Sequence, residues 1–190
     1  MNKLLFAVVW CFIVVFGFFS LASAQYVIGQ LTSSPGEDYV QDINASGQVI
    51  WYGSDGNDNE IFLYDGATIL QLTDNAYDDF DPKLNDSGHV VWSGFDGNDY
   101  EIFLYDGIQV IQLTDNTFND YVYGINASGQ ITWVGHDGND YEIFLYGGTL
   151  PATQLTDNAF DDNDPRLMTP AMWYGTASMV MTTRSSSTTV

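Results

Sequence analysis

The sequence predicts an all-β fold, a β-propeller-type array of four-stranded antiparallel blades with three complete blades and a broken fourth. One observation is a block of sequence that recurs at intervals of 41 or 42 residues, marked by Ile43, Leu84, Ile125 and Leu167. A four-stranded propeller blade has this length. The other is the alternation of β-branched and aromatic runs with clusters of Asn, Asp, Ser and Gly, which is typical of strands joined by hairpins.

The first block shows how the strands are assigned. Four short runs follow one another, the first ending at Ile43 and the others covering residues 48–52, 60–64 and 68–73. The third run is apolar from Ile61 to Tyr64, and its counterparts in the later blocks are the same. A strand of this kind belongs to a sheet that is covered on both faces. Neighbouring blades can provide that cover, so we expect the repeats to pack against one another.

Residues 1–24 are predicted to be a signal peptide. Lys3 is followed by an apolar run, and Ala22-Ser23-Ala24 forms a small-residue cleavage site. Cleavage would leave a secreted or periplasmic protein without membrane contact. The alternative is an uncleaved membrane anchor, because the apolar run is close to the length that spans a bilayer.

The region 25–167 is assigned to three repeated units, covering about residues 43–83, 84–124 and 125–166. The composition then changes abruptly, and residues 168–190 are predicted to be an aberrant, disordered tail. Codons can be chosen for this tail such that one restored base turns it into another copy of the repeat. We therefore interpret it as an out-of-frame translation of a fourth unit.

The charge balance limits the partners. The chain has 25 Asp and Glu residues against 4 Lys and Arg residues, and a formal net charge of −21. Between Glu37 and Asp164, Lys83 is the only Lys or Arg. Such a surface repels nucleic acid and anionic membranes, so neither is an expected partner. Cations are the expected counterpart.

Most of the acids are expected at one end of the blades. In an antiparallel meander, the loop between the second and third strands and the connection to the next unit lie at the same end. We call this end the acidic rim. Its expected members are Asp55, Asp58, Glu60, Asp74, Asp78, Asp79, Asp81, Asp96, Asp99, Glu101, Asp115, Asp120, Asp137, Asp140, Glu142, Asp157, Asp161, Asp162 and Asp164.

Calcium is the one cofactor that this pattern suggests, because Ca²⁺ binds several carboxylate and carbonyl oxygens at flexible geometry. The alternative is that Asp-Gly-Asn-Asp serves only as a hairpin turn, since these residues tolerate the dihedral angles of a turn. Both interpretations stay open at this point. The candidate metal ligands are Asp55, Asp58, Glu60, Asp96, Asp99, Glu101, Asp137, Asp140 and Glu142.

Several motifs resemble the repeat of TolB-type β-propellers. They are Gln71-Leu72-Thr73-Asp74-Asn75, Asp81-Pro82, Asp86-Ser87-Gly88 and the segment 96–104. The resemblance covers about residues 26–167. It implies a propeller in which the first strand of each blade lines the channel and the fourth is outermost.

The chain also departs from that pattern. Val122-Tyr123 stands where Asp-Pro is expected, and the separate N-terminal domain of TolB is absent. Relatives of TolB include lyases and peptidases, but none of their catalytic residues can be placed on this chain. We therefore assign no catalytic residue.

The predicted function is that of an exported, non-enzymatic scaffold that binds a protein or a polysaccharide, with Ca²⁺ as a bridging ion. One alternative is a fragment of a propeller enzyme, of the polysaccharide lyase or glycosidase type, that lacks its active-site blades. Another is a non-functional pseudogene product. Three blades do not close a ring, and their exposed apolar flanks predict self-association.

Overall fold

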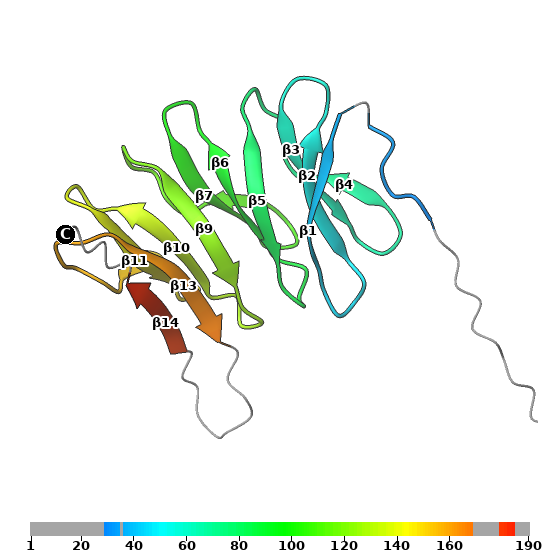
Figure 1. Ribbon diagram of the computed structural model, residues 1–190. Helices are drawn as coiled ribbons and strands as arrows, with labels where there is room; N and C mark the ends of the chain where they lie inside the picture. Colours follow the sequence, from blue (N-terminus) through cyan, green and yellow to red (C-terminus); the bar gives the residue numbers. More distant parts are fainter. Residues whose placement is uncertain (1–28, 35, 169–178, 185–190) are drawn as a thin grey trace, which may run out of the picture. The chain divides into compact units, whose positions relative to one another are not determined.

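The computed structural model describes residues 29–34, 36–168 and 179–184. Three four-stranded antiparallel sheets follow one another along the chain, and we call them blades 1, 2 and 3 (Figure 1). Blade 1 consists of β1 (Asp38–Ile43), β2 (Val49–Ser54), β3 (Asn59–Tyr64) and β4 (Ile69–Gln71). Blade 2 consists of β5 (Asp79–Leu84), β6 (Val90–Phe95), β7 (Tyr100–Tyr105) and β8 (Val110–Gln112). Blade 3 consists of β9 (Asp120–Ile125), β10 (Ile131–His136), β11 (Tyr141–Tyr146) and β12 (Thr153–Gln154).

Each blade is a simple meander, because its strands pair in the order in which they occur in the sequence. No described residue lies in a helix, so the predicted all-β fold class is confirmed. The first strand of each blade pairs with the second through an irregular register, whereas the second and third strands pair without interruption. The first strand also begins upstream of the apolar residue that marks the repeat, at Asp38 in blade 1.

A two-stranded sheet follows blade 3 and contains β13 (Asp162–Met168) and β14 (Met179–Arg184). β14 is a strand, whereas the sequence predicts that the whole tail, residues 168–190, is disordered. An open strand edge offers unpaired backbone groups to a following segment, which is the physical reason for such pairing. The rest of the tail, 169–178 and 185–190, and the predicted signal peptide, 1–24, lie outside the described residues.

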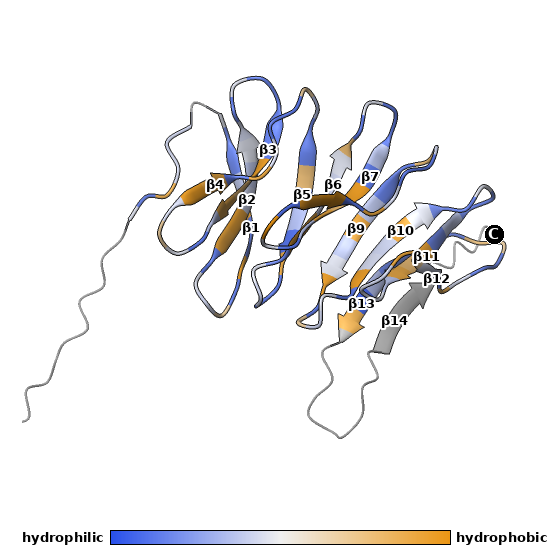
Figure 2. Ribbon diagram, turned by 180° about the vertical axis from the view of Figure 1, so that it is seen from behind, coloured by the Kyte–Doolittle hydropathy of each residue, from blue (hydrophilic) through white to orange (hydrophobic). Residues whose placement is uncertain are grey.

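Apolar side chains from neighbouring blades share their cores. Trp92 and Trp133, on the second strands of blades 2 and 3, are almost completely buried. Figure 2 shows hydrophobic residues along the strands and hydrophilic residues in the loop between β2 and β3 and in its counterparts. One cluster joins blades 1 and 2 through Ile50, Ile61, Leu63, Leu84, Val90 and Trp92. A second cluster joins blades 2 and 3 through Val91, Ile102, Leu104, Leu113, Val122, Ile131 and Trp133.

A buried row of polar residues accompanies these cores at the acidic rim. In blade 2, Gly94 on the central strand pairs with Asp79 on one side and with Glu101 on the other. The Asp79 carboxylate accepts hydrogen bonds from Trp92 Nε1 at 3.2 Å and from Asn75 Nδ2 at 2.8 Å. This carboxylate lies over Gly94, where a Cβ atom would be 2.2 Å from Asp79 Oδ1. Glycine is therefore required for the carboxylate to fit.

The same row brings acids of two blades together. Glu60 on β3 is fully buried, and Asp79 at the start of β5 is 2 % exposed. The pKa of Glu60 is raised to about 7, first by burial and also by the negative charges of Asp79 and Asp58, against hydrogen bonds that lower it. Burial also raises the pKa of Asp79, and that of Asp120 at the next junction. Part of this acid cluster is therefore protonated near neutral pH.

Asparagines connect the blades at the opposite end. Asn44 Nδ2 donates a hydrogen bond to the backbone oxygen of Asn85 at 3.0 Å, and Asn85 Nδ2 donates to the backbone oxygen of Asn126 at 3.1 Å. Asn85 is buried, and its own Oδ1 accepts hydrogen bonds from two backbone N–H groups of its turn. One residue type therefore shapes the turn and ties the neighbouring blades.

Replacing Gly94 by alanine should destabilise the protein, because the new Cβ would meet the held carboxylate of Asp79 and the ring of Phe103. We expect the free energy of unfolding in urea to fall by about 1–3 kcal/mol, the usual cost of overpacking a core. Gly124→Ala is the matched control, because nothing lies within 4 Å of a Cβ at Gly124. Equal urea midpoints for the two variants would contradict the buried row.

The buried acids also predict a pH dependence. The pKa of Glu60 is raised from its ordinary value of 4.5 to about 7 in the folded protein, so the folded state binds its proton more tightly than the unfolded chain. The stability from Glu60 is therefore fully present below pH 4.5 and is lost as the pH rises through 7. Urea unfolding in EDTA should show this fall, and Glu60→Gln should flatten it. A wild-type protein that is more stable at pH 8 than at pH 5 would contradict the assignment.

Candidate functional site

The acidic rim is built on two loops of each blade. The first is the loop between the fourth strand and the next blade. Leu72 N donates to the backbone oxygen of Ile61 at 2.7 Å, and Thr73 Oγ1 accepts from Ile61 N at 2.9 Å. Asn75 N then donates to Glu60 Oε1 at 2.9 Å. Because Asp74 lies between two residues that bond to β3, it is fixed beside that strand.

The second loop is the hairpin between the second and third strands. In blade 1, Asp55 Oδ1 accepts a hydrogen bond from Asn57 N at 2.9 Å, and Asp55 N donates to the backbone oxygen of Asp58 at 3.2 Å. Gly56 has a φ of 118°, which favours glycine. The turn is therefore held by Asp55 Oδ1, while the second oxygen of the same carboxylate accepts none of these bonds.

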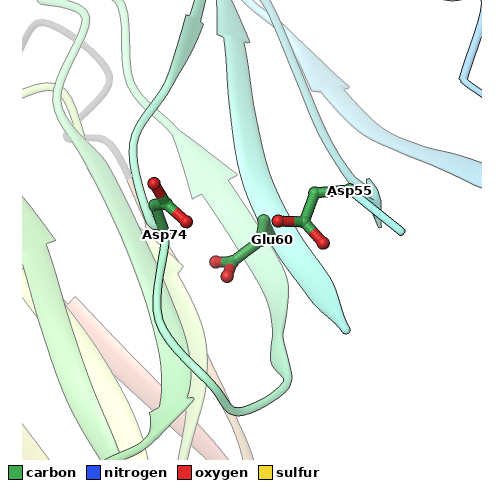
Figure 3. A group of neighbouring side chains, drawn as sticks. All are labelled: Asp55, Glu60 and Asp74. Atoms are coloured by element: carbon green, nitrogen blue, oxygen red, sulfur yellow. The ribbon is translucent and has the colours of Figure 1, made fainter. Parts of the chain in front are cut away.

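These loops bring three carboxylates together in each blade. In blade 1, one oxygen each of Asp55, Glu60 and Asp74 lies within 4.8 Å of the other two. Figure 3 shows the three side chains turned toward one another, with Glu60 between the other two. The same distance limit holds in the other blades, for Asp96, Asp99 and Glu101 and for Asp137, Glu142 and Asp157.

The structure changes the set of residues that the sequence singles out. In blades 1 and 3, Asp58 and Asp140 lie in the predicted hairpins, but the carboxylate clusters contain Asp74 and Asp157 instead. The remaining seven predicted ligands, Asp55, Glu60, Asp96, Asp99, Glu101, Asp137 and Glu142, all fall in the clusters. The missed residues carry a signal in the sequence, because Thr-Asp-Asn recurs after the fourth strand of every unit.

Two acids that were expected at the rim lie elsewhere. Asp81 and Asp164 are the third residues of β5 and β13, within the strands and not in the loops. Both adopt a left-handed backbone conformation, with φ of 53° and 54°. They coincide with the irregular register between the first strand and its neighbour, which leaves these positions outside the regular ladder.

Several buried oxygens of the clusters accept no hydrogen bond from any described residue. They are Oε2 of Glu60, Oε2 of Glu142 and both carboxylate oxygens of Asp99. Outside the clusters, Oδ1 of Asp58 and Oδ1 of Asp140 in the adjoining hairpins also lack a partner among the described residues. Glu60 and Glu142 are fully buried, and Asp99 is 8 % exposed. Buried polar groups almost always have a partner, because losing hydration without one is costly. The oxygens of Glu60, Glu142 and Asp99 therefore face the clusters without a hydrogen-bond donor from the described residues.

The pKa values of the hairpin acids reflect the same crowding. Burial first, and the charge of a neighbouring Asp second, raise the pKa of Asp58, Asp99 and Asp140. In contrast, hydrogen bonding to the backbone N–H of Asn139 lowers the pKa of Asp137. The hairpin of blade 3 therefore combines an acid that is disfavoured as an anion, Asp140, with one that is favoured as an anion, Asp137.

A second concave surface lies along the first strands of blades 2 and 3. It is a groove of about 600 Å³, and Lys83 and Asp81 line it together with Tyr121, Tyr123 and Tyr141. Lys83 therefore lies in this groove, and it contributes no ligand atom to the three carboxylate clusters.

Among the residues that the structure describes, no helix is long and apolar enough to cross a membrane. No protein-family model and no curated protein matches the sequence.

Similar solved structures are propellers. TolB from Acinetobacter baumannii superposes with a TM-score of 0.57 at 13 % identity, over 81 % of this chain and 42 % of TolB. Porphyromonas gingivalis dipeptidyl peptidase 4 gives a TM-score of 0.55 at 16 % identity, over 80 % of this chain and 26 % of the peptidase. The β-propeller domain of the Trilobed protease from Pyrococcus furiosus gives 0.50 at 17 % identity, over 63 % of this chain and 40 % of that structure.

This chain thus spans less than half the length of each of these proteins. At such low identity the likeness concerns the fold, and it is shared by TolB and by domains of peptidases. The resemblance seen in the sequence motifs is confirmed at that level: the chain has a TolB-like β-propeller fold.

Proposed function

We propose that the protein is an exported, non-enzymatic scaffold whose acidic rim binds a protein or polysaccharide partner in a Ca²⁺-dependent manner. The observation that carries this proposal is the recurrence of a carboxylate cluster at the same end of all three blades. A surface that repeats with the blades suits an extended or repetitive partner. Export follows from the N-terminal sequence, which has the pattern of a signal peptide.

The repetition also argues against an active site in the described part of the chain. Catalysis needs several unlike groups that converge on one point, whereas the blades present nearly identical sets of acids. The two histidines lie at opposite ends of their blades. His89 precedes the second strand of blade 2, and His136 ends the second strand of blade 3, where it packs against Phe118 and Tyr141.

The flank of blade 1 supports self-association. Strand β5 packs on blade 1 through Leu84, which is 6 % exposed, but the same repeat position on β1 is Ile43, which is 64 % exposed. Likewise Val122 on β9 is 6 % exposed, whereas its counterpart Val40 on β1 is 68 % exposed. The flank of β1 is thus an unpaired copy of a surface that buries apolar residues between the other blades.

The scaffold role predicts binding without turnover. Polygalacturonate, an anionic polysaccharide, should be retained by the immobilised protein in biolayer interferometry with CaCl₂ but not with EDTA, and no new reducing ends should appear. Glu60→Gln with Glu142→Gln should weaken retention. The matched control is Asp65→Asn with Asp106→Asn, which removes the same charge from the opposite end of the blades. Release of reducing ends would instead support the enzyme alternative.

Self-association should depend on the flank of β1. We expect the protein to elute above its monomer mass in size-exclusion chromatography with light scattering, and Val40→Asp with Ile43→Asp to shift it toward the monomer. Ile108→Asp serves as the control, because Ile108 is 88 % exposed in the loop after β7. A wild-type protein that is already monomeric would contradict this mode of association.

A further inference from the structure

We propose that each blade holds one Ca²⁺ ion at the acidic rim, which gives three sites in the described chain. This inference rests on the Ca²⁺ dependence of the proposed function and adds the ligands and their number. The ligands are Asp55, Glu60 and Asp74 in blade 1, Asp96, Asp99 and Glu101 in blade 2, and Asp137, Glu142 and Asp157 in blade 3.

The buried oxygens without partners are the first argument. Glu60 Oε1 is occupied by Asn75 N, but Glu60 Oε2 accepts no bond from the described residues although the side chain is fully buried. Glu142 repeats this arrangement with Asn158 N as its donor. A carboxylate oxygen that is buried and faces two further carboxylates must carry a proton or bind a cation, since another acceptor cannot satisfy it.

The geometry selects the class of cation. All three ligand groups are oxygen donors, which hard cations prefer, whereas zinc sites use nitrogen and sulfur more often. At the usual Ca²⁺–oxygen distance, two oxygens on opposite sides of the ion lie about 4.6–5.2 Å apart. Oxygens within 4.8 Å of one another fit around one such ion. Mg²⁺ requires a smaller and more regular shell.

The protein has few basic side chains that could neutralise the clusters, so the cation would come from solution. Lys83 is the only Lys or Arg between Glu37 and Asp164, and it lies in the groove along the first strands. The three clusters hold nine carboxylates, whereas the described residues include only three Lys and Arg residues, Lys83, Arg166 and Arg184, the last of which is the strand partner of Asp162. Because Ca²⁺ takes six to eight ligands, the exposed side of each cluster would keep positions for water or for oxygens of a partner.

Blade 2 forms its cluster differently. Glu101 Oε1 accepts from Asn116 N at 2.6 Å, and Glu101 Oε2 accepts from the hydroxyl of Thr114, so neither oxygen lacks a partner. Both oxygens of Asp99 lack one instead. The cluster of blade 2 thus includes the hairpin residue Asp99, whereas that of blade 1 includes Asp74 from the following loop, and each has three carboxylates.

The test is a calorimetric titration of the EDTA-treated full chain with CaCl₂ alone. We expect saturable binding of three ions per chain and a higher melting temperature with Ca²⁺ than with EDTA. Asp74→Asn should reduce the number of sites to two, whereas Asp65→Asn should leave three. Both variants remove one carboxylate charge from blade 1, but Asp65 lies in the loop after β3, at the end opposite the acidic rim, and only Asp74 belongs to the cluster.

Glu60→Gln is the second variant, because the amide oxygen can still accept the bond from Asn75 N while the anion is removed. It should also leave two sites, and circular dichroism in EDTA should show the strand signal of the wild type. Loss of a site in Asp65→Asn but not in Asp74→Asn would overturn the ligand set. Absence of saturable binding, or equal binding of MgCl₂, would overturn the calcium assignment.

The readout separates this inference from the proposed function. Titration with CaCl₂ requires no partner, so three sites without retention of any polymer would keep the ion sites and reject the scaffold role. Retention of polygalacturonate that is unaffected by EDTA, together with no saturable binding of CaCl₂, would reject the ion sites and the Ca²⁺ dependence and keep the scaffold role. Each result therefore bears on one of the two proposals.

Discussion

The architecture depends on the packing of each blade against the first strand of the next blade. That strand must bury apolar residues such as Leu84 on the preceding blade, and it must also bring an aspartate to the rim. Gly94 makes the burial of Leu84 and the placement of Asp79 compatible. The Asp79 carboxylate occupies the space where any other residue at position 94 would have a side chain. The apolar cores, the asparagine ties and the rim acids are all arranged around this contact.

The sequence predicts the fold well because the signal is periodic. The recurrence of Ile43 and Leu84 and the fully apolar third strands are direct consequences of stacked blades. The start of the first strand is harder to predict, because Asp79 resembles a loop acid in the sequence. Its burial depends on Trp92 and Gly94, whose side of the sheet becomes known only when the strands are paired.

The candidate site is predictable in its location but not in its composition. Alternating loops place the acids at one end, and the structure agrees for the hairpin residues. Which carboxylates face one another depends on hydrogen bonds between distant residues. Asp74 enters its cluster because Thr73 and Asn75 bond to β3. Such cross-strand bonds leave no periodic trace, although the recurrent Thr-Asp-Asn indicates that the loop is built alike in every unit.

The recurrence of a carboxylate cluster in all three blades has a consequence for affinity. Sites that are joined in one chain bind a multivalent ligand with an effective concentration set by their linkage, so that weak individual contacts can combine into strong overall attachment. A ligand with a single contact group would gain nothing from this arrangement. The repeated rim would therefore favour long polymers over their short fragments by avidity, even if each cluster bound both equally well.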